Sequence, residues 1–138
     1  CRGAEALDML QAMNTGHEGS LTTLHANSPR DALARLETLV LMAGMDLPLN
    51  AIREQIASAI DIIVQQTRFA CGTRRVTSIC EVTGLEGGRV QLQELFRFER
   101  AGQRGERFVG CDAVPNFYDE LRQRQVALDF TIFDRLPA

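Results

Sequence analysis

The polar segment Thr15 to Asn27, TGHEGSLTTLHAN, holds both histidines of the chain, His17 and His25. Imidazole, hydroxyl and amide groups gathered in this way are unusual unless something charged binds nearby. Ser20 to Ala26 is short, contains threonines and is only weakly amphipathic, which predicts a strand buried on both faces. If that strand belongs to a parallel sheet, His25 stands at its carboxyl end, where open α/β sheets bind ligands.

The residues after His25 predict the start of a helix. Ser28 is a good N-cap, Pro29 a good first helical residue, and Asp31 can complete a variant of the capping box. A helix N-terminus offers backbone N–H donors to an anion. These residues therefore predict an α/β domain with a candidate anion site near His25.

A metal site is not expected from the two histidines. An extended path from His17 to His25 puts them up to about 20 Å apart, at opposite edges of the sheet. Zinc would need a third ligand, and the chain offers no convincing one. A structural or capping role is the alternative for either histidine taken alone, and a stand-alone metal hydrolase is the weakest functional hypothesis.

Length and composition narrow the class of protein. The 138 residues suit one globular domain, with 45% hydrophobic and 24% charged residues. A net charge of -3 without a basic run gives no support to nucleic-acid binding. All 15 basic residues are arginine, so these residues contain no intact GxxxxGK[ST] phosphate loop. The opening at Cys1, without an initiator methionine, indicates a fragment of a longer protein.

The four cysteines form no CxxC pair, and their spacing suits neither a disulfide framework nor a zinc ribbon. Cys80 lies in an apolar run and is predicted to be a small core residue. We expect a reducing, cytoplasmic location.

The remaining pattern predicts further helices and strands. Helices are expected at residues 4–14, from 29 toward 44 and from 48 to about 60, and strands at 62–64, 75–82 and 89–98. The glycine-rich residues 83–88 predict a hairpin turn rather than a phosphate cradle, because they join two strands. Residues 100–110 are predicted to be a polar loop, and residues 117–124 and 130–136 two short closing helices.

Three stretches resemble the bacterial secretion ATPase superfamily of type II and type IV secretion motors and pilus ATPases. They are CRGAEALDMLQAMNTGHEGSLTTLHANSPRDALARLE, LPLNAIREQIASAIDIIVQQTR and RRVTSICEVTGLEGGRV. The histidine spacing and the HANSPRDAL continuation resemble the CpaF-type tight-adherence (Flp) pilus branch, with type IV secretion ATPases second. The resemblance covers nearly the whole chain, loosely after Arg100, and departs from the family in the less polar turn at Phe69 to Gly72.

The resemblance implies an α/β fold: the C-terminal part of a RecA-like P-loop ATPase domain that lacks the Walker A half. Such a domain has three layers and a mostly parallel sheet with a β-hairpin extension. Residues 1–138 would form one portion of it, divided into the histidine-box strand and helices (1–69), the hairpin (70–99), and the loop and closing helices (100–138). The family forms hexamers and binds ATP and Mg²⁺ between subunits.

The same resemblance implies roles for the site residues. Thr15 to Asn27 is similar to the family's histidine box, in which His25 would sense or polarise the terminal phosphate, and His17 is a further catalytic candidate. Thr23 and Asn27 would contact the nucleotide. Such side chains suit phosphoryl transfer, which depends on charge stabilisation and on positioning water.

Cys1 and Arg2 resemble the two residues that follow the glycine–glutamate pair of the family's Walker B segment. The catalytic glutamate would then immediately precede Cys1. Arg2 would hold that glutamate or neutralise developing charge; an ordinary ion pair or a solvated terminus is the alternative.

The resulting hypothesis is a motor ATPase that powers pilus assembly or secretion at the cytoplasmic face of the inner membrane. It would dock on an inner-membrane platform protein, and the 138 residues alone would be inactive. The alternative is a non-catalytic assembly module whose apolar helices around Leu33 and Ile52 supply ring contacts, although core packing explains these helices equally well.

Overall fold

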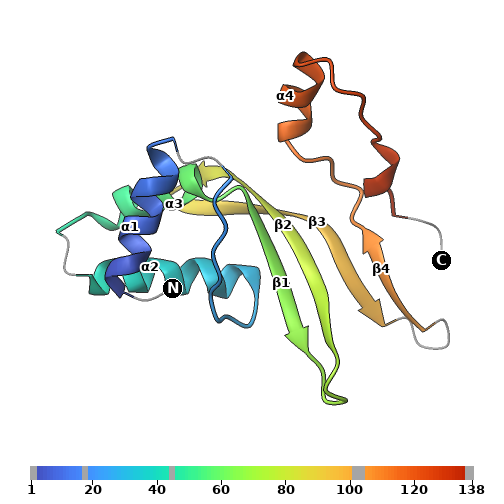
Figure 1. The fold of residues 1–138 in the computed structure, drawn as a ribbon, viewed down its shortest axis with the longest axis horizontal. Helices are drawn as coiled ribbons and strands as arrows, with labels where there is room; N and C mark the ends of the chain where they lie inside the picture. Colours follow the sequence, from blue (N-terminus) through green and yellow to red (C-terminus); the bar gives the residue numbers. More distant parts are fainter. Residues whose placement is uncertain (1–2, 17–18, 44–45, 101–104, 136–138) are drawn as a thin grey trace. The chain divides into compact units, whose positions relative to one another are not determined.

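The computed structural model describes residues 3–16, 19–43, 46–100 and 105–135. Its elements, shown in Figure 1, are α1 (Gly3–Asn14), α2 (Pro29–Met42), α3 (Leu49–Ala59), β1 (Ile62–Arg68), β2 (Arg74–Glu86), β3 (Arg89–Arg100), β4 (Glu106–Gly110), α4 (Phe117–Gln123) and the 3₁₀ helix η2 (Thr131–Phe133). The chain forms two compact units. We call Cys1–Asp61 with Val82–Leu92 the helical unit, and Ile62–Glu81 with Gln93–Ala138 the sheet unit.

The helical unit is built on three helices that pack against one another, α1, α2 and α3. In α2, Leu33, Leu36 and Val40 are buried. In α3, Ile52 and Ile56 are buried, whereas Leu49 at its start is exposed. Spacings of three and four residues place such side chains on one face of a helix, and their burial supplies the main stabilisation of the unit.

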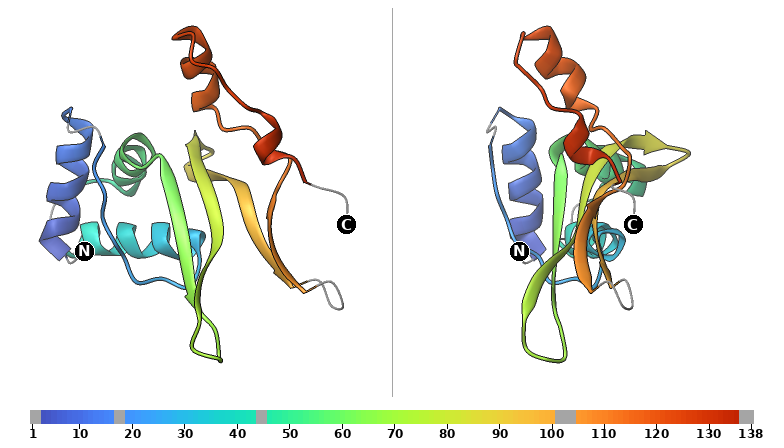
Figure 2. Two further views of the ribbon diagram at one scale, coloured as in Figure 1. Left: turned by 45° about the vertical axis from the view of Figure 1, so that its right-hand side comes forward. Right: turned by 90° about the vertical axis from the view of Figure 1, so that its right-hand side faces the viewer.

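The strands form one sheet in the order β1-β2-β3-β4, and most of their residues belong to the sheet unit. Figure 2 shows the strands from two sides. β1 pairs antiparallel with β2, and β3 pairs antiparallel with β4. The register of β1 and β2 shifts between Gln65 and Gln66, which indicates a β-bulge. Helices and strands together confirm the α/β class; the strands that the described residues form are antiparallel, so the predicted parallel layer is not among them.

The predicted strand at Ser20 to Ala26 is wrong. These residues are extended but form no strand, and Leu21 is 98% exposed rather than buried. A strand exists only where a neighbouring strand completes its hydrogen-bond ladder, and no such ladder reaches this segment among the described residues. His25 therefore does not stand at the carboxyl end of a parallel strand.

Two other predictions change. Residues 100–110 were expected to be a loop, but Glu106–Gly110 form β4, because Arg107 and Val109 pair with Glu99 and Arg97 of β3. The hairpin turn is also tighter than predicted, since β2 continues to Glu86 and only Gly87 and Gly88 separate it from β3. Both glycines have positive φ, at 58° and 76°, as a two-residue type I′ hairpin requires.

Within the sheet unit, residues 111–135 after β4 pack against the strands through aromatic rings. Phe133 is buried, and its ring centroid lies 5.4 Å from that of Phe96 and 5.1 Å from that of Tyr118. The backbone N–H of Asn116 donates to both carboxylate oxygens of buried Glu81, each at 2.9 Å. Cys80 is buried, as predicted. None of the described helices combines the length and the apolar character needed to cross a membrane.

Candidate functional site

The candidate site is the extended segment that precedes α2. Thr23, His25 and Asn27 are all exposed, while Leu24 and Ala26 between them are partly covered. An extended backbone turns alternate side chains to the same side, so the three polar residues share one side of the segment. They can donate hydrogen bonds to an oxyanion.

The N-terminus of α2 lies directly beyond these residues in the chain. Ser28 has extended backbone angles, and its hydroxyl accepts the N–H of Asp31 at 3.1 Å, which confirms the predicted N-cap. The N–H of Ala32 donates to the Ser28 carbonyl at 2.9 Å, and Pro29 has no N–H. Of the N–H groups in the first turn, only that of Arg30 is therefore not engaged with Ser28.

The start of α2 can contribute little to anion binding. One free N–H in the first turn is weaker than the several converging donors of a phosphate-binding helix start. The Asp31 carboxylate in the same turn stabilises the helix but repels a second anion. Most of the binding energy for a phosphate must therefore come from groups other than this helix start.

Two predicted site residues, Arg2 and His17, lie outside the described residues, so their positions relative to His25 stay predictions. Figure 1 draws both segments as a grey trace. Among the residues that the structure does describe, no group of three or more histidine, cysteine, aspartate or glutamate side chains is arranged to hold a metal ion.

Two arginines that the sequence pattern did not single out connect helices to the β2–β3 hairpin: Arg30 at the start of α2 and Arg53 of α3. Arg30 Nη1 donates to the carbonyl of Val90 at 2.7 Å, and Arg53 Nη1 donates to the carbonyl of Gly88 at 2.9 Å. Arg53 Nε also donates to Glu37 of α2 at 2.9 Å. The two contacts with the hairpin join residues 60 and 35 positions apart in the chain, so no local pattern could have revealed them. They fix Arg30, two residues after Ser28, to the hairpin.

Comparison with known proteins identifies the family. The sequence family described as "Type II/IV secretion system protein" matches residues 1–127. The chain belongs to this family. The match includes the segment with Thr23, His25 and Asn27, the three helices of the helical unit, and the β2–β3 hairpin.

Individual relatives agree with the family. The chain is 39% identical over 99 residues to a Mycobacterium tuberculosis protein named for conjugal transfer, covering 72% of this chain and 27% of that protein. It is 37% identical over 98 residues to the conjugal transfer protein TrbB of Rhizobium radiobacter, covering 71% and 29%. It is 43% identical over 89 residues to the type IV secretion system protein PtlH of Bordetella pertussis, covering 61% and 26%. The chain thus spans less than a third of the length of these relatives.

Proposed function

We propose that the chain is part of an ATPase that powers a type II or type IV secretion system or the assembly of a pilus. The observation that carries the proposal is the family match over residues 1–127, together with relatives named for conjugal transfer and type IV secretion. Within that proposal the finer assignment is a CpaF-type Flp pilus motor that works as a hexamer and docks on an inner-membrane platform protein from the cytoplasmic side.

The nucleotide would be ATP with Mg²⁺. The described residues have groups that could contact its terminal phosphate, but they do not include a phosphate loop. Exposed His25, Thr23 and Asn27 carry hydrogen-bond donors appropriate to a terminal phosphate. No lysine is present in the 138 residues, so the phosphate loop is not among them. These residues would therefore orient the terminal phosphate and its attacking water rather than supply the main phosphate affinity.

In this proposal, His25 polarises the terminal phosphate. In that role its hydrogen bond strengthens as charge develops, so the group acts mainly on turnover and little on binding. We expect His25→Ala in the full-length protein to lower kcat about 100-fold or more. Nucleotide affinity should change by less than about threefold, because the ground-state contacts are retained.

The experiment measures steady-state ATP hydrolysis and the Kd of a fluorescent nucleotide for wild type, His25→Ala and Arg35→Ala. Arg35 is an exposed residue of α2 and serves as the control. Unchanged turnover in His25→Ala would remove this role from His25. Absence of hydrolysis in the wild-type full-length protein would count against the ATPase proposal as a whole.

A second candidate function, a non-catalytic assembly module, is favoured by one observation in the helical unit. Among its described residues, four large apolar side chains are exposed: Leu21 at 98%, Met42 at 75%, Leu41 at 48% and Leu49 at 39%. Such residues suit a contact with another chain. Size-exclusion chromatography with light scattering, over a range of concentrations, tests this function. A strictly monomeric species would contradict self-assembly through these residues.

A further inference from the structure

The end of the sheet unit that carries the β1–β2 turn has an unusual pair of arginines. Arg68, the last residue of β1, is the register partner of Arg74, the first residue of β2. Both are exposed, and no described carboxylate lies within 4 Å of either guanidinium. Like charges directly opposite one another on paired strands destabilise a sheet. The pair therefore costs stability unless an anion from outside compensates it.

The neighbouring arginines are only partly neutralised. Glu106 is shared between Arg75 at 3.0 Å and Arg100 at 3.5 Å. Glu99 is likewise shared between Arg107 at 3.6 Å and Arg135 at 2.9 Å. Two carboxylates thus serve four guanidinium groups, and Arg68 and Arg74 add two further positive charges. The net charge of the chain, -3, makes this local positive surplus a distinct feature.

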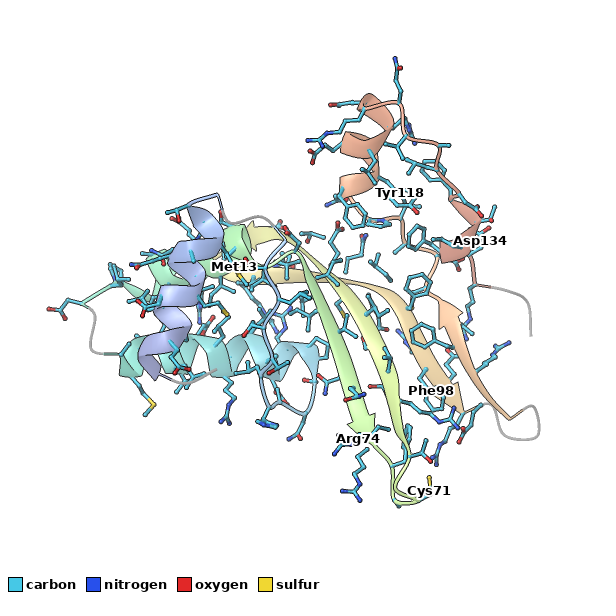
Figure 3. All side chains as sticks on the ribbon, viewed as in Figure 1. Met13, Cys71, Arg74, Phe98, Tyr118 and Asp134 are labelled. Atoms are coloured by element: carbon cyan, nitrogen blue, oxygen red, sulfur yellow. The ribbon has the colours of Figure 1, made fainter. Side chains whose placement is uncertain are left out.

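Aromatic rings hold two of these guanidinium groups in place. Arg75 Cζ lies 5.6 Å from the ring centroid of Phe98, and Arg100 Cζ lies 4.7 Å from that of Phe69. Figure 3 shows Arg74 near the turn that holds Cys71, with Phe98 on β3. Stacking holds each guanidinium in place while Glu106 engages one of its nitrogens, so little conformational freedom remains to be lost when its other N–H groups bind a carboxylate.

Apolar surface accompanies the charge. A pocket of ≈320 Å³ is lined by Arg75, Val76, Phe98, Glu106, Arg107 and Phe108. Val76 and Phe108 in this lining are 38% and 45% exposed. An anionic group and an apolar side chain on the same ligand would complement the two arginines and the apolar residues of this lining.

We propose that this basic sheet end, defined as Arg68, Arg74, Arg75, Arg100 and Arg107 with Val76 and Phe108, docks an acidic peptide segment of a partner protein that also carries aliphatic or aromatic side chains. Charge complementarity identifies the partner's acidic character, and the exposed Val76 and Phe108 identify its apolar side chains. Glu106 in the pocket lining disfavours the denser anionic charge of a lipid surface. Binding of this peptide segment does not depend on ATP hydrolysis.

The test uses the full-length protein without nucleotide and a fluorescent peptide that alternates Asp or Glu with Leu or Phe. Anisotropy titrations compare wild type with Arg68→Gln/Arg74→Gln. The matched control is Arg122→Gln/Arg124→Gln, which removes two exposed positive charges from the region of α4. We expect the first double variant to weaken binding about tenfold, because it loses two charge-assisted hydrogen bonds. The control should stay within about twofold of wild type.

Two further readouts separate binding from a structural role. Removing the opposed like charges should leave the melting temperature of Arg68→Gln/Arg74→Gln unchanged or raise it. A peptide with Gly in place of Leu and Phe should bind more weakly than the parent peptide, which tests the apolar contact. Equal weakening in both double variants, or a fall in melting temperature that accounts for lost binding, would overturn the proposal. Binding to phosphatidylglycerol vesicles without binding to the peptide would overturn it too, in favour of a membrane surface.

Discussion

Arg53 of α3 donates one hydrogen bond to the carbonyl of Gly88 in the β2–β3 turn and a second to Glu37 of α2, both at 2.9 Å. A single guanidinium thus joins two helices to a hairpin within the helical unit. The backbone carbonyl of Gly88 cannot move away without breaking the turn, so the contact fixes the hairpin tip as well as the helices.

Replacing Arg53 with Met should therefore destabilise the helical unit. A hydrogen bond from a charged donor contributes about 1.5–3 kcal/mol, and the 29% exposure of this side chain reduces that value. We expect a loss of about 1–2 kcal/mol in the free energy of unfolding, measured by urea denaturation. Arg35→Met removes an exposed arginine from α2 and should change stability by less than about 0.5 kcal/mol. Equal effects of the two changes would show that the contacts of Arg53 contribute nothing.

Substitution of Ser28 tests the N-cap of α2. Its hydroxyl accepts the N–H of Asp31, and Ser28→Ala leaves this donor to solvent. Loss of a cap costs about 1 kcal/mol, so Ser28→Ala should lower the unfolding free energy by that amount. Ser28→Asp keeps an acceptor in the same place and should retain most of the stability. If Ser28→Asp is as unstable as Ser28→Ala, the hydroxyl is not acting as a cap.

Gly110 at the end of β4 has no room for a side chain. A Cβ built on it would lie 2.3 Å from the carbonyl oxygen of Phe133, which is backbone and cannot rotate away. Gly110→Ala should push η2 from the sheet and break the hydrogen bond from the Asp112 N–H to Phe133 O, now 2.9 Å. We expect a loss of at least about 2 kcal/mol, as for an overpacked site. Faster hydrogen exchange at Asp112 would report the displaced segment.

Gly72→Ala is the matched comparison for Gly110→Ala. Gly72 has a φ of 88° but meets no atom within 4 Å. Its substitution tests backbone strain without a clash, which costs about 1 kcal/mol. An Asp112 exchange rate that rises equally in both variants would contradict the steric explanation for Gly110.

Local signals in the sequence predicted local structure. The apolar spacing of Leu33, Leu36 and Val40, and the Ser28-Pro29 start, led to the correct helix and the correct cap. The same kind of signal failed at Ser20 to Ala26, because a strand depends on a neighbouring strand that local pattern cannot supply. It also missed β4, because Glu106–Gly110 follow the polar residues 100–105 and read as part of the same loop until their pairing with β3 is known.

Only part of the candidate site could be predicted from the sequence. Family resemblance predicted His25, Thr23 and Asn27, which are exposed and precede α2 in the structure. The contacts of Arg30 and Arg53 with the hairpin bring together residues distant in the chain, so only the fold reveals them. The opposed pair Arg68 and Arg74 required the register of β1 and β2.

The described cysteines allow a prediction about pH. Cys71 is exposed in the β1–β2 turn, with its Sγ 3.4 Å from Thr73 Oγ1. Hydrogen bonds from the hydroxyl and the backbone N–H of Thr73 lower the pKa of this thiol. Burial, followed by the charge of Glu94, raises the pKa of Cys111. The thiolate is the reactive form, so at a pH below both values Cys71 carries the larger thiolate fraction.

Alkylation by iodoacetamide, followed by peptide-resolved mass spectrometry between about pH 6.5 and 9.5, measures this order. Cys71 should react first, Cys111 later, and buried Cys80 last, since access also limits the rate. The pH at half-maximal rate should lie below the usual thiol pKa for Cys71 and above it for Cys111. Thr73→Val removes the hydroxyl and should move the Cys71 midpoint upward while leaving that of Cys111 unchanged. A Cys71 midpoint that does not move would mean that Thr73 does not stabilise the thiolate.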